Sequence, residues 1–569
     1  MEGRLTMKMI RIGAMSWQLS DGVPAVALFD ADGFRLPRWL ASGEASSVKE
    51  RSHRGVWHVT LPGLDFYLKH DRPVKTSLLH KIARTGSVRS EFELGRELAR
   101  RGVPTPEPLA FGERISGSAE GFLLTRTLPE SVPLDLFLES SLALFPPHRQ
   151  TQVRQQIALA LGRLLALLHD AGVTHRDLHP GNLLLQFGAD GVPRLSLIDL
   201  HAVRLGAPLS RSAGLANLVI LNRWFILRSE RTDRQRCWQA YIAARQVGCT
   251  FSTAVVNAPL LCRQLERGTL HSNLAFWRNR DRRCRTTNRY FRTVRQGDVK
   301  GYAVADLPAD ALTPFLAEPD AAFAQAGVKL LKNSPSSTVA EMELPVNGGT
   351  LSVVYKRFAV TKGTDPWVAL ARPTAALRSW VSGHALISRL LPTPRPLVVL
   401  HRFRHGLAYE GYLLTEKVSN ALEPGAYLER LAGIGNSATR TRDLLDRVGR
   451  LLRRLHDRHL SHRDLKAPNL LLQLASDGLT VENIFFIDLV GVRRHGKLRR
   501  PRRVQNLTRL HASFRNNPAV TRTDKLRFLR AYLAWGLYGR LGWKRWWRQI
   551  EAATEAKVIK NRRNGRPLK

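Results

Sequence analysis

Residues 174–185 read THRDLHPGNLLL, and residues 461–472 repeat the string as SHRDLKAPNLLL. Each copy follows a stretch in which apolar residues recur three and four positions apart, the pattern of a buried helical face. Each copy also precedes an apolar run that ends in an aspartate, Asp199 after LSLI and Asp488 after IFFI. Because helix, loop and strand end recur together, the sequence predicts two copies of one structural unit.

The spacing inside the two loops is that of a phosphoryl-transfer site. A hydroxyl acceptor needs a carboxylate near its proton, and the transferred phosphoryl group needs a divalent metal to neutralise its charge. In an HRDxxxxN loop the aspartate is the base and the asparagine binds metal, while an aspartate after the next hairpin binds Mg²⁺. We therefore expect Asp177 and Asp464 to be the catalytic bases. The expected metal ligands are Asn182, Asp199, Asn469 and Asp488. The alternative is that these side chains only cap turns around a buried strand pair.

A kinase of this type also needs a lysine on a strand, which reaches the ATP phosphates and is held by a glutamate from the next helix. Lys69, in DFYLKH, lies 108 residues before Asp177. Lys356, in VVYKRF, lies 108 residues before Asp464. The equal spacing predicts that the two lysines occupy equivalent ATP-binding positions, although either one alone is typical of a solvated strand edge.

The glutamate partner differs between the copies. Aligning VPTPEPL, residues 103–109, with LPTPRPL, residues 391–397, puts Glu91 opposite Ser379. Glu91 is therefore the predicted partner of the first lysine. Two residues farther along the same helix are alternatives: Glu93 and Glu97. The second helix, RSWVSGHALISRL, holds no acidic residue, so we expect the second site to be impaired or arranged differently.

Two parts of the protein-kinase pattern are missing from both copies. No GxGxxG loop precedes either lysine strand, where the sequence reads KERSHRGVW and KNSPSSTVA. No APE segment or long activation loop follows Asp199 or Asp488. Because a peptide acceptor normally lies on that segment, the sequence favours an acceptor that is not a protein.

Together these strings resemble the lipopolysaccharide kinase family of the Kdo/WaaP type. The resemblance rests on YLKH and VYKRF, the VPTPEPL strand, the HRDLxxxN loops, IDL in place of DFG, and the tail NLTRLHASFRNNPAVTRTDKLRFLRAYL. It implies a protein-kinase-like fold and phosphorylation of inner-core sugars of lipopolysaccharide with ATP and Mg²⁺. The first loop departs from the family where it ends in GNLLL, since many members have a histidine and a phenylalanine there. The second copy departs where it lacks the helix glutamate.

The resemblance implies an α+β fold of two tandem protein-kinase-like domains, each with a small β-rich lobe and a larger, mainly helical lobe. We expect a lead-in segment at 1–44, the first domain at 45–302, a linker at 303–327 and the second domain at 328–569. The linker, rich in Ala, Asp and Pro, echoes the lead-in, so both segments are also candidates for parts of the small lobes. No secretory signal and no apolar run of about 18 residues is visible, so we expect a cytoplasmic protein, free or peripheral at the inner membrane.

Charge is the strongest compositional signal, with 88 Lys and Arg against 47 Asp and Glu and a net charge of +41. Such a field attracts polyanions. The segment 276–295, with aromatic residues between arginines, suits nucleic acid, whereas GWKRWWRQI at 542–550 suits an anionic membrane surface. The paired kinase motifs favour an anionic glycolipid over nucleic acid. The four cysteines show no metal-binding spacing, and we expect reduced thiols.

The sequence as a whole predicts an ATP- and Mg²⁺-dependent kinase for a sugar hydroxyl of a lipid-linked glycan. In the first domain, Lys69 and Glu91 are expected to fix the ATP phosphates. Lys356 is expected to bind nucleotide in the second domain, whose turnover is left open. Two alternatives stand beside this prediction: an atypical protein kinase, and a non-catalytic scaffold that binds nucleic acid or membrane through its basic surface.

Overall fold

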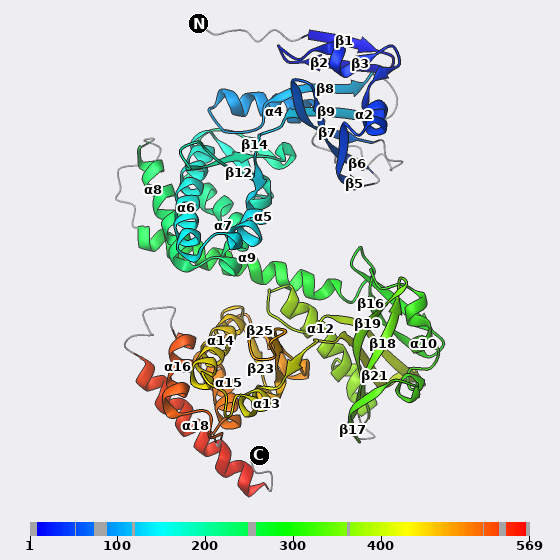
Figure 1. Ribbon diagram of the computed structural model, residues 1–569, viewed down its shortest axis with the longest axis vertical. Helices are drawn as coiled ribbons and strands as arrows, with labels where there is room; N and C mark the ends of the chain where they lie inside the picture. Colours follow the sequence, from blue (N-terminus) through cyan, green and yellow to red (C-terminus); the bar gives the residue numbers. More distant parts are fainter. Residues whose placement is uncertain are drawn as a thin grey trace. The chain divides into compact units, whose positions relative to one another are not determined.

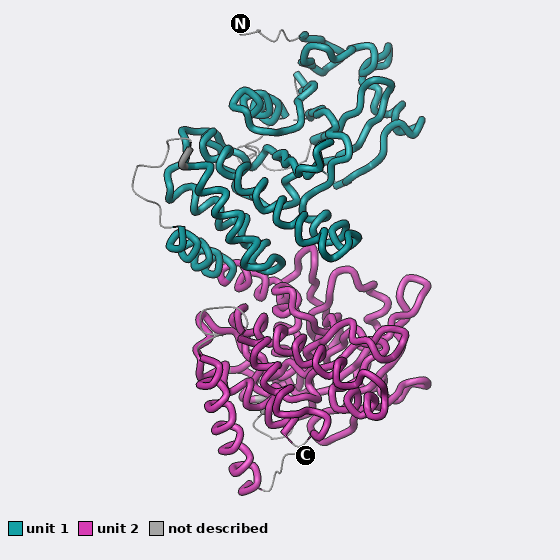
Figure 2. Tube along the Cα trace, turned by 60° about the vertical axis from the view of Figure 1, so that its left-hand side comes forward, with its two compact units in different colours: residues 1–273 teal, residues 274–569 magenta. Residues whose placement is uncertain are grey.

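The structure is a computed structural model and describes residues 8–51, 53–72, 88–115, 120–247, 258–360, 365–515, 517–533 and 542–564. The chain divides into two compact units, residues 1–273 and 274–569 (Figure 2). The division falls within helix α9, Ala258–Arg283, and so lies earlier than the expected boundary at residue 302. The reason is that residues 291–304 form two strands that belong to the sheet of the second unit.

The first unit begins with an antiparallel sheet of seven strands, in the spatial order β1–β2–β8–β9–β7–β6–β5 (Figure 1). Its strands are β1 Lys8–Ile12, β2 Met15–Leu19, β5 Ala45–Arg51, β6 Arg54–Leu61, β7 Leu64–Asp71, β8 Pro108–Arg114 and β9 Gly121–Arg126. Along β7, Leu64, Phe66 and Leu68 are buried, and the residues between them alternate to the other face. Lys69 follows this alternation and faces helix α4, Val88–Arg100, which packs on β8 and β9.

The amino-terminal segment is part of this small lobe. A hairpin of β3 Phe29–Asp30 and β4 Gly33–Phe34 is flanked by α1 Ala25–Leu28 and α2 Leu36–Ser42. Trp17 and Trp39, both almost fully buried, join the segment to the core of the sheet. The two strands at 8–19, within the expected lead-in segment, are part of the seven-stranded sheet.

The large lobe of the first unit is mainly helical. Its helices are α5 Leu134–Glu139, α6 Pro147–Asp170, α7 Arg211–Arg228, α8 Arg231–Val247 and the first part of α9. The helix expected before the HRD loop is α6, which buries Ile157, Leu161 and Leu165. Helix α8 approaches α6 closely at Gly162, where a β-carbon would lie 2.3 Å from the carbonyl oxygen of Cys237.

Two small sheets carry the loops of this lobe. One has the order β10–β12–β13, and the other pairs β11 with β14. Their bounds are β10 Val132–Pro133, β11 Val173–His175, β12 Leu183–Phe187, β13 Pro193–Leu197 and β14 Val203–Leu205. The HRD loop therefore leaves β11 and enters β12, and Asp199 lies two residues after the end of β13. Because β12 and β13 pair with each other, the end of the HRD loop lies next to Asp199.

The second unit has the same strand order in its small lobe, β15–β16–β20–β21–β19–β18–β17 (Figure 1). These strands are β15 Phe291–Gln296, β16 Val299–Val304, β17 Lys329–Ser334, β18 Ser337–Val346, β19 Gly349–Phe358, β20 Pro396–Arg404 and β21 Leu407–Glu416. The stretch 303–327, expected as a linker, contains α10 Thr313–Ala317 and buries Leu312 and Phe315 in the core of this lobe. The structure therefore assigns it to the small lobe, as its likeness to the amino-terminal segment suggests.

The large lobe of the second unit repeats the arrangement of the first. Its sheets are β22–β24–β25 and β23–β26, with bounds β22 Ala421–Leu422, β23 Leu460–His462, β24 Leu470–Leu474, β25 Val481–Phe486 and β26 Val492–Arg494. The helices of the unit are α11 Asp365–Ala371, α12 Ala375–Ile387, α13 Pro424–Arg430, α14 Ser437–Asp457, α15 Arg500–Ser513, α16 Arg522–Leu533 and α18 Trp543–Arg563. The expected fold class is confirmed: each unit has a β-rich small lobe and a mainly helical large lobe.

Candidate active site

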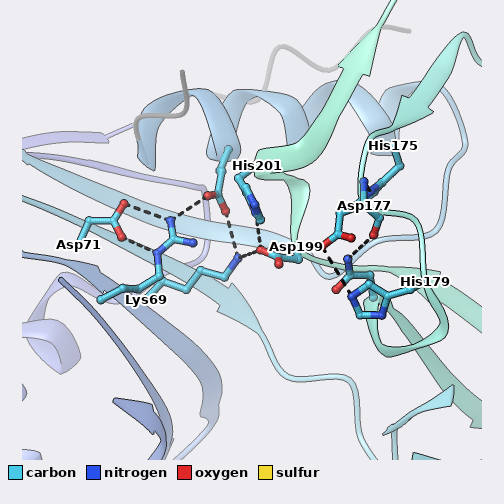
Figure 3. Close-up of polar contacts among 10 residues, drawn as sticks. Lys69, Asp71, His175, Asp177, His179, Asp199 and His201 are labelled. Carbon is cyan, nitrogen blue, oxygen red and sulfur yellow. Dashed lines mark hydrogen bonds and ion pairs between the residues drawn. The ribbon is translucent and has the colours of Figure 1, made fainter. Parts of the chain in front are cut away.

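Lys69 lies between two carboxylates in the first unit (Figure 3). Its Nζ is 3.0 Å from Oε2 of Glu91 and 3.5 Å from Oδ1 of Asp199. Glu91 comes from α4 and is buried, with 3% of its side chain exposed, so its charge requires cationic partners. The structure thus brings together the lysine, helix glutamate and strand-end aspartate that the sequence spacing predicts, and it selects Glu91 over Glu93 and Glu97.

Glu91 has a second cationic partner that the sequence did not indicate. Nη2 of Arg54 is 3.2 Å from Oε1 of Glu91, and Nε of Arg54 is 2.5 Å from Oδ1 of Asp71. The hydrogen bond to Asp71 is the main cause that raises the pKa of Arg54 above its usual value, against the effect of burial. Arg54 and Asp71 are register partners on β6 and β7, so this contact depends on hairpin register. Only an aligned hairpin would have revealed it.

Asp199 has a left-handed backbone, with φ 59° and ψ 60°, which is rare for a residue other than glycine. Its Oδ1 accepts a hydrogen bond from Nδ1 of His201 at 2.7 Å (Figure 3). Burial acts to raise the pKa of Asp199, but the His201 hydrogen bond and the Lys69 charge together hold it well below its usual value. Asp199 is therefore a carboxylate at neutral pH. His201 is a second contact that the sequence reasoning missed.

Asp177 and Asn182 lie at the two ends of the HRD loop. The Asp177 side chain is 71% exposed, so an acceptor hydroxyl can reach it from solvent. Its backbone is fixed, because Asp177 N–H donates to Nδ1 of buried His175 at 3.2 Å and its carbonyl accepts from Nδ2 of Asn182 at 2.9 Å. The backbone carbonyl of Asn182 accepts from Ile198 N–H at 3.0 Å, which places Asn182 beside the strand end that carries Asp199.

Buried polar side chains from the helices support this loop. His169, at the end of α6, contacts the hydroxyl of Tyr241 through Nδ1 at 2.9 Å and Oδ1 of Asn217 through Nε2 at 3.3 Å. Nδ2 of Asn217 donates to the His175 carbonyl at 2.8 Å. Burial lowers the pKa of His169 to about 4, so the imidazole is neutral at pH 7. In the second unit His456, Asn506 and Tyr532 repeat the contacts at 2.8 and 3.2 Å.

The second unit keeps the loop geometry. Nδ2 of Asn469 donates to the Asp464 carbonyl at 2.6 Å, and Asp464 N–H donates to Nδ1 of His462 at 3.2 Å. Asp488 has the same left-handed backbone, with φ 53° and ψ 62°. Lys356 contacts Oδ1 of Asp488 at 3.0 Å.

The partners around Lys356 differ from those around Lys69. Val339 pairs with Lys356 as Val56 pairs with Lys69, so the hairpin register aligns the two units residue by residue. Four charged or titratable residues of the first unit are replaced in the second: Arg54 by Ser337, Asp71 by Phe358, Glu91 by Ser379 and His201 by Val490. The Lys356 ammonium lies 4.8 Å from the centre of the Phe358 ring. The absent glutamate is therefore one of four replacements around the lysine, while the contact with the strand-end aspartate is kept.

The oxygen donors of the first unit fit a magnesium nucleotide. Mg²⁺ prefers oxygen ligands and is usually held by one or two carboxylates together with substrate phosphates. Asp199 is a carboxylate at neutral pH, and Lys69 and His201 both contact its Oδ1, which leaves Oδ2 for a metal. The side-chain nitrogen of Asn182 donates its hydrogen bond within the loop, to the Asp177 carbonyl. This leaves the side-chain oxygen of Asn182 as a ligand for a metal. Asp488 and Asn469 provide the same atoms in the second unit.

Several other sequence expectations fall outside these sites. Cys237, Cys262 and Cys284 are free thiols, and burial raises the pKa of each; Cys249 lies outside the described residues. Trp277, expected as a candidate for base stacking, is buried with 2% exposed. The tryptophans of GWKRWWRQI pack in or against the helical core of the second unit. No helix in the described part of the chain combines the length and the apolar character that crossing a bilayer requires.

Comparison with known proteins bears on the family of the chain. The model of the "Lipopolysaccharide kinase (Kdo/WaaP) family" matches residues 46–244 and 364–532. A 3-deoxy-D-manno-octulosonic acid kinase of Xanthomonas campestris pv. campestris is 36% identical over 228 residues, covering 37% of this chain and 84% of that protein. The lipopolysaccharide core heptose(I) kinase WaaP of Pseudomonas aeruginosa is 31% identical over 165 residues, covering 27% of this chain and 60% of that protein.

This chain therefore spans less than two thirds of the length of the Pseudomonas relative. A solved structure of WaaP in complex with acyl carrier protein is 23% identical and covers 41% of this chain and 91% of that chain, with a TM-score of 0.30. The two segments matched by the family model together make up more than half of the chain, and each contains one HRD loop and its strand-end aspartate. The chain belongs to the lipopolysaccharide kinase (Kdo/WaaP) family.

Proposed function

We propose that this chain is an ATP- and Mg²⁺-dependent kinase that phosphorylates a sugar hydroxyl of a lipid-linked glycan of the lipopolysaccharide core. The observation that carries the proposal is the first-unit cluster in which Lys69 contacts both Glu91 and Asp199. The Asp177 loop is bonded to the backbone beside that cluster. A binding scaffold has no physical need for a base, two metal ligands and a paired lysine in one place.

The proposal gives each residue of this cluster a role. Lys69, oriented by Glu91, binds the phosphates of ATP, and Asn182 and Asp199 would hold Mg²⁺, which would supply positive charge to neutralise the transferred group. Asp177 accepts the proton of the acceptor hydroxyl as that oxygen bonds to the γ-phosphorus. The bond from the γ-phosphorus to the bridging oxygen breaks, and ADP leaves. The exposure of Asp177 leaves room for a large glycan acceptor.

The acceptor class follows from the relatives. Two of them are named as kinases of 3-deoxy-D-manno-octulosonic acid and of core heptose, so we propose one of these two sugars as the acceptor. Short segments follow the strand-end aspartates: α7 begins at Arg211 and α15 at Arg500. Without a long segment there, the usual platform for a peptide is missing, which supports a sugar over a protein acceptor.

We propose that the second unit binds nucleotide but transfers phosphate poorly. It keeps the proposed lysine, base and metal ligands: Lys356 contacts Asp488, and Asn469 bonds to the Asp464 carbonyl. Ser337, Phe358 and Ser379 replace the carboxylates and the arginine that hold Lys69 in the first unit. Lys356 therefore has the aspartate and an aromatic ring as neighbours, and its position is less constrained.

The proposal is tested by incubating the intact chain with labelled ATP and Mg²⁺, and with lipopolysaccharide precursor or total cell protein as acceptor. We expect label in the glycolipid, and a loss of at least about 100-fold in kcat for Asp177→Asn, because general base catalysis typically contributes that much. Asp464→Asn is expected to have a small effect. Asp190→Asn, an exposed aspartate in the turn after β12, is the matched control with unchanged transfer.

The alternatives give different results in the same assay. Label in protein and not in glycolipid supports an atypical protein kinase. No transfer to either acceptor, with Asp177→Asn and the wild type equal in every readout, supports a non-catalytic scaffold. Equal losses for Asp177→Asn and Asp464→Asn contradict the proposed division between the units.

A further inference from the structure

Lys466 contacts Asp464, the predicted base of the second unit, and two further cationic side chains interact with this aspartate electrostatically. Nζ of Lys466 lies 3.4 Å from Oδ2 of Asp464. Arg509 on α15 and Lys557 on α18 both interact electrostatically with Asp464. Burial lowers the pKa of Arg509 and of Lys557, and the negative charge of Asp464 opposes this shift in both. The three cations come from three separate elements and share one neighbour.

Hydrogen bonds hold these elements together. The loop is attached to α15, because Ala467 N–H donates a hydrogen bond to Oγ of Ser513 at 3.0 Å. Arg509 lies one helical turn before Ser513 and therefore on the same face of α15, towards the loop. His511 of α15 bonds Oγ1 of Thr554 on α18 through Nδ1 at 3.1 Å. Lys557 follows Thr554 by three residues and lies on that side of α18.

These cations outnumber the acids that face them. Among the described residues, neither Arg509 nor Lys557 forms an ion pair with a carboxylate, and Nη1 of Arg509 is buried without a hydrogen-bond partner. Asp464 is one negative charge among three positive ones. A buried, unsatisfied guanidinium nitrogen is costly, so its retention beside a predicted acceptor position suggests that an anion completes the site.

The first unit provides an internal comparison, because the same helix contacts occur there. Asn217 and Asn506 hold equivalent histidines, which aligns α7 with α15 and places Ile220 where Arg509 stands. Thr269 bonds Asn222 on α7 as Thr554 bonds His511 on α15, which aligns α9 with α18. The residues of the first unit at the three cationic positions are His179, Ile220 and Ser272. None of them carries a permanent positive charge.

We propose that the site at Asp464 binds a glycan that carries a phosphate or carboxylate group next to the hydroxyl facing Asp464, and that Lys466, Arg509 and Lys557 hold this anionic group. The identification of the ligand as a core glycan rests on the proposed function. The preference for an anionic substituent belongs to the second unit and is absent from the first. It holds whether or not the second unit transfers phosphate, because it concerns binding.

The test measures binding of deacylated core oligosaccharide to the intact chain without ATP, by titration calorimetry. Four forms of the probe are compared: untreated, phosphatase-treated, carboxyl-reduced, and both treated and reduced. We expect the untreated form to bind wild type at least about tenfold more tightly than the doubly modified form, a difference of 1.4 kcal/mol. The step at which affinity falls identifies the group: phosphatase treatment for phosphate, carboxyl reduction for carboxylate.

The decisive variant gives the second unit the residues of the first: Lys466→His, Arg509→Ile and Lys557→Ser. We expect it to bind all four probes equally, with an unchanged melting temperature. Arg509→Lys keeps the charge and is expected to retain most of the preference. The matched control, Lys329→Ser with Lys332→Ser and Arg522→Ser, removes three exposed cations elsewhere in the unit and is expected to behave as wild type.

Three results overturn the proposal: no binding of any probe, equal binding of all four by wild type, or an undiminished preference in the triple swap. Because no ATP is present, the failure of the proposed function is seen separately. A chain that prefers the anionic probe but transfers no label in the kinase assay loses the proposed function and keeps this site.

Discussion

At the scale of single residues, the site depends on Glu91 and its two cations. A carboxylate with 3% exposure is destabilised unless it is fully paired, and both of its oxygens are engaged, one by Lys69 and one by Arg54. The sequence predicted the lysine contact, because the two copies share the lysine spacing. It did not predict Arg54 or His201, since these contacts arise from strand register and from a left-handed turn, which no spacing reports.

Arg54→Ala is expected to weaken ATP use without removing a ligand of the nucleotide. Without Arg54, Lys69 is the remaining ion-pair partner of Glu91. The Glu91 carboxylate is then less firmly positioned, and so is the lysine that binds the phosphates. We expect kcat/KM for ATP to fall by about tenfold, since a charge-assisted hydrogen bond is worth ~1.5–3 kcal/mol. Steady-state kinetics with labelled ATP measure this. Arg72→Ala, at an exposed ion pair with Glu50 beyond the end of the same hairpin, is the control. A fall of equal size in both variants would argue against a specific role for Arg54.

At the scale of elements, a buried histidine, asparagine and tyrosine connect three helices to the strand before each HRD loop. In the first unit these residues are His169, Asn217 and Tyr241. The sequence predicted the helix before the loop from its apolar spacing, and α6 confirms it. It did not predict the polar contacts, because Tyr241 and Asn217 lie 72 and 48 residues from His169. The repeated LHD before both loops was the signal that was available.

These histidines make stability depend on pH. In the unfolded chain a histidine binds a proton near pH 6.5, whereas burial lowers the pKa of His169 to about 4 and that of His456 to about 3 in the folded chain. Between these values the unfolded state binds more protons, so the free energy of unfolding falls as the pH drops below 6.5. For His169 the full effect is roughly 3 kcal/mol.

We expect His169→Gln to be less stable at pH 7 and to lose less stability than wild type between pH 6.5 and pH 4.5. Urea unfolding followed by tryptophan fluorescence at several pH values measures both. His148→Gln, an exposed histidine in the first turn of the same helix, is expected to follow the wild-type curve. Parallel curves for His169→Gln and wild type would contradict this account.

At the scale of the whole molecule, the sequence predicted two kinase-like units and missed how each begins. Strands at 8–19 and 291–304 join sheets whose other members lie far along the chain: β2 pairs with β8, and β16 pairs with β20. Alternating apolar residues indicate a strand but not its partner, so the boundary between the units was placed too late. Residues 303–327 were interpreted as a linker because they are rich in Ala, Asp and Pro, and only the alternative placed them in the small lobe, whose core their apolar side chains fill.

The net charge of +41 is also a property of the whole chain. Because the tryptophans expected at a membrane surface pack in the helical core, we expect peripheral binding that is electrostatic and not driven by insertion. Binding to vesicles with anionic lipid should fall by about tenfold or more between low and high salt, since screening shortens the range of the attraction. Vesicle cosedimentation measures it, with neutral vesicles as the control. Equal binding to neutral vesicles would exclude this mode of attachment.

One pair of hydrogen bonds joins the small lobe to the large lobe in each kinase-like unit. Thr105 Oγ1 donates to the Leu197 carbonyl at 2.8 Å, and Leu197 N–H donates to the Pro104 carbonyl at 2.8 Å. Thr393, Phe486 and Pro392 repeat both bonds in the second unit at 2.8 and 3.0 Å. These bonds fasten the small lobe to the large one two residues before the strand-end aspartate. We therefore expect nucleotide entry and exit to be rotations about a pivot next to the predicted metal ligand, which would move that residue less than the far edges of the lobes.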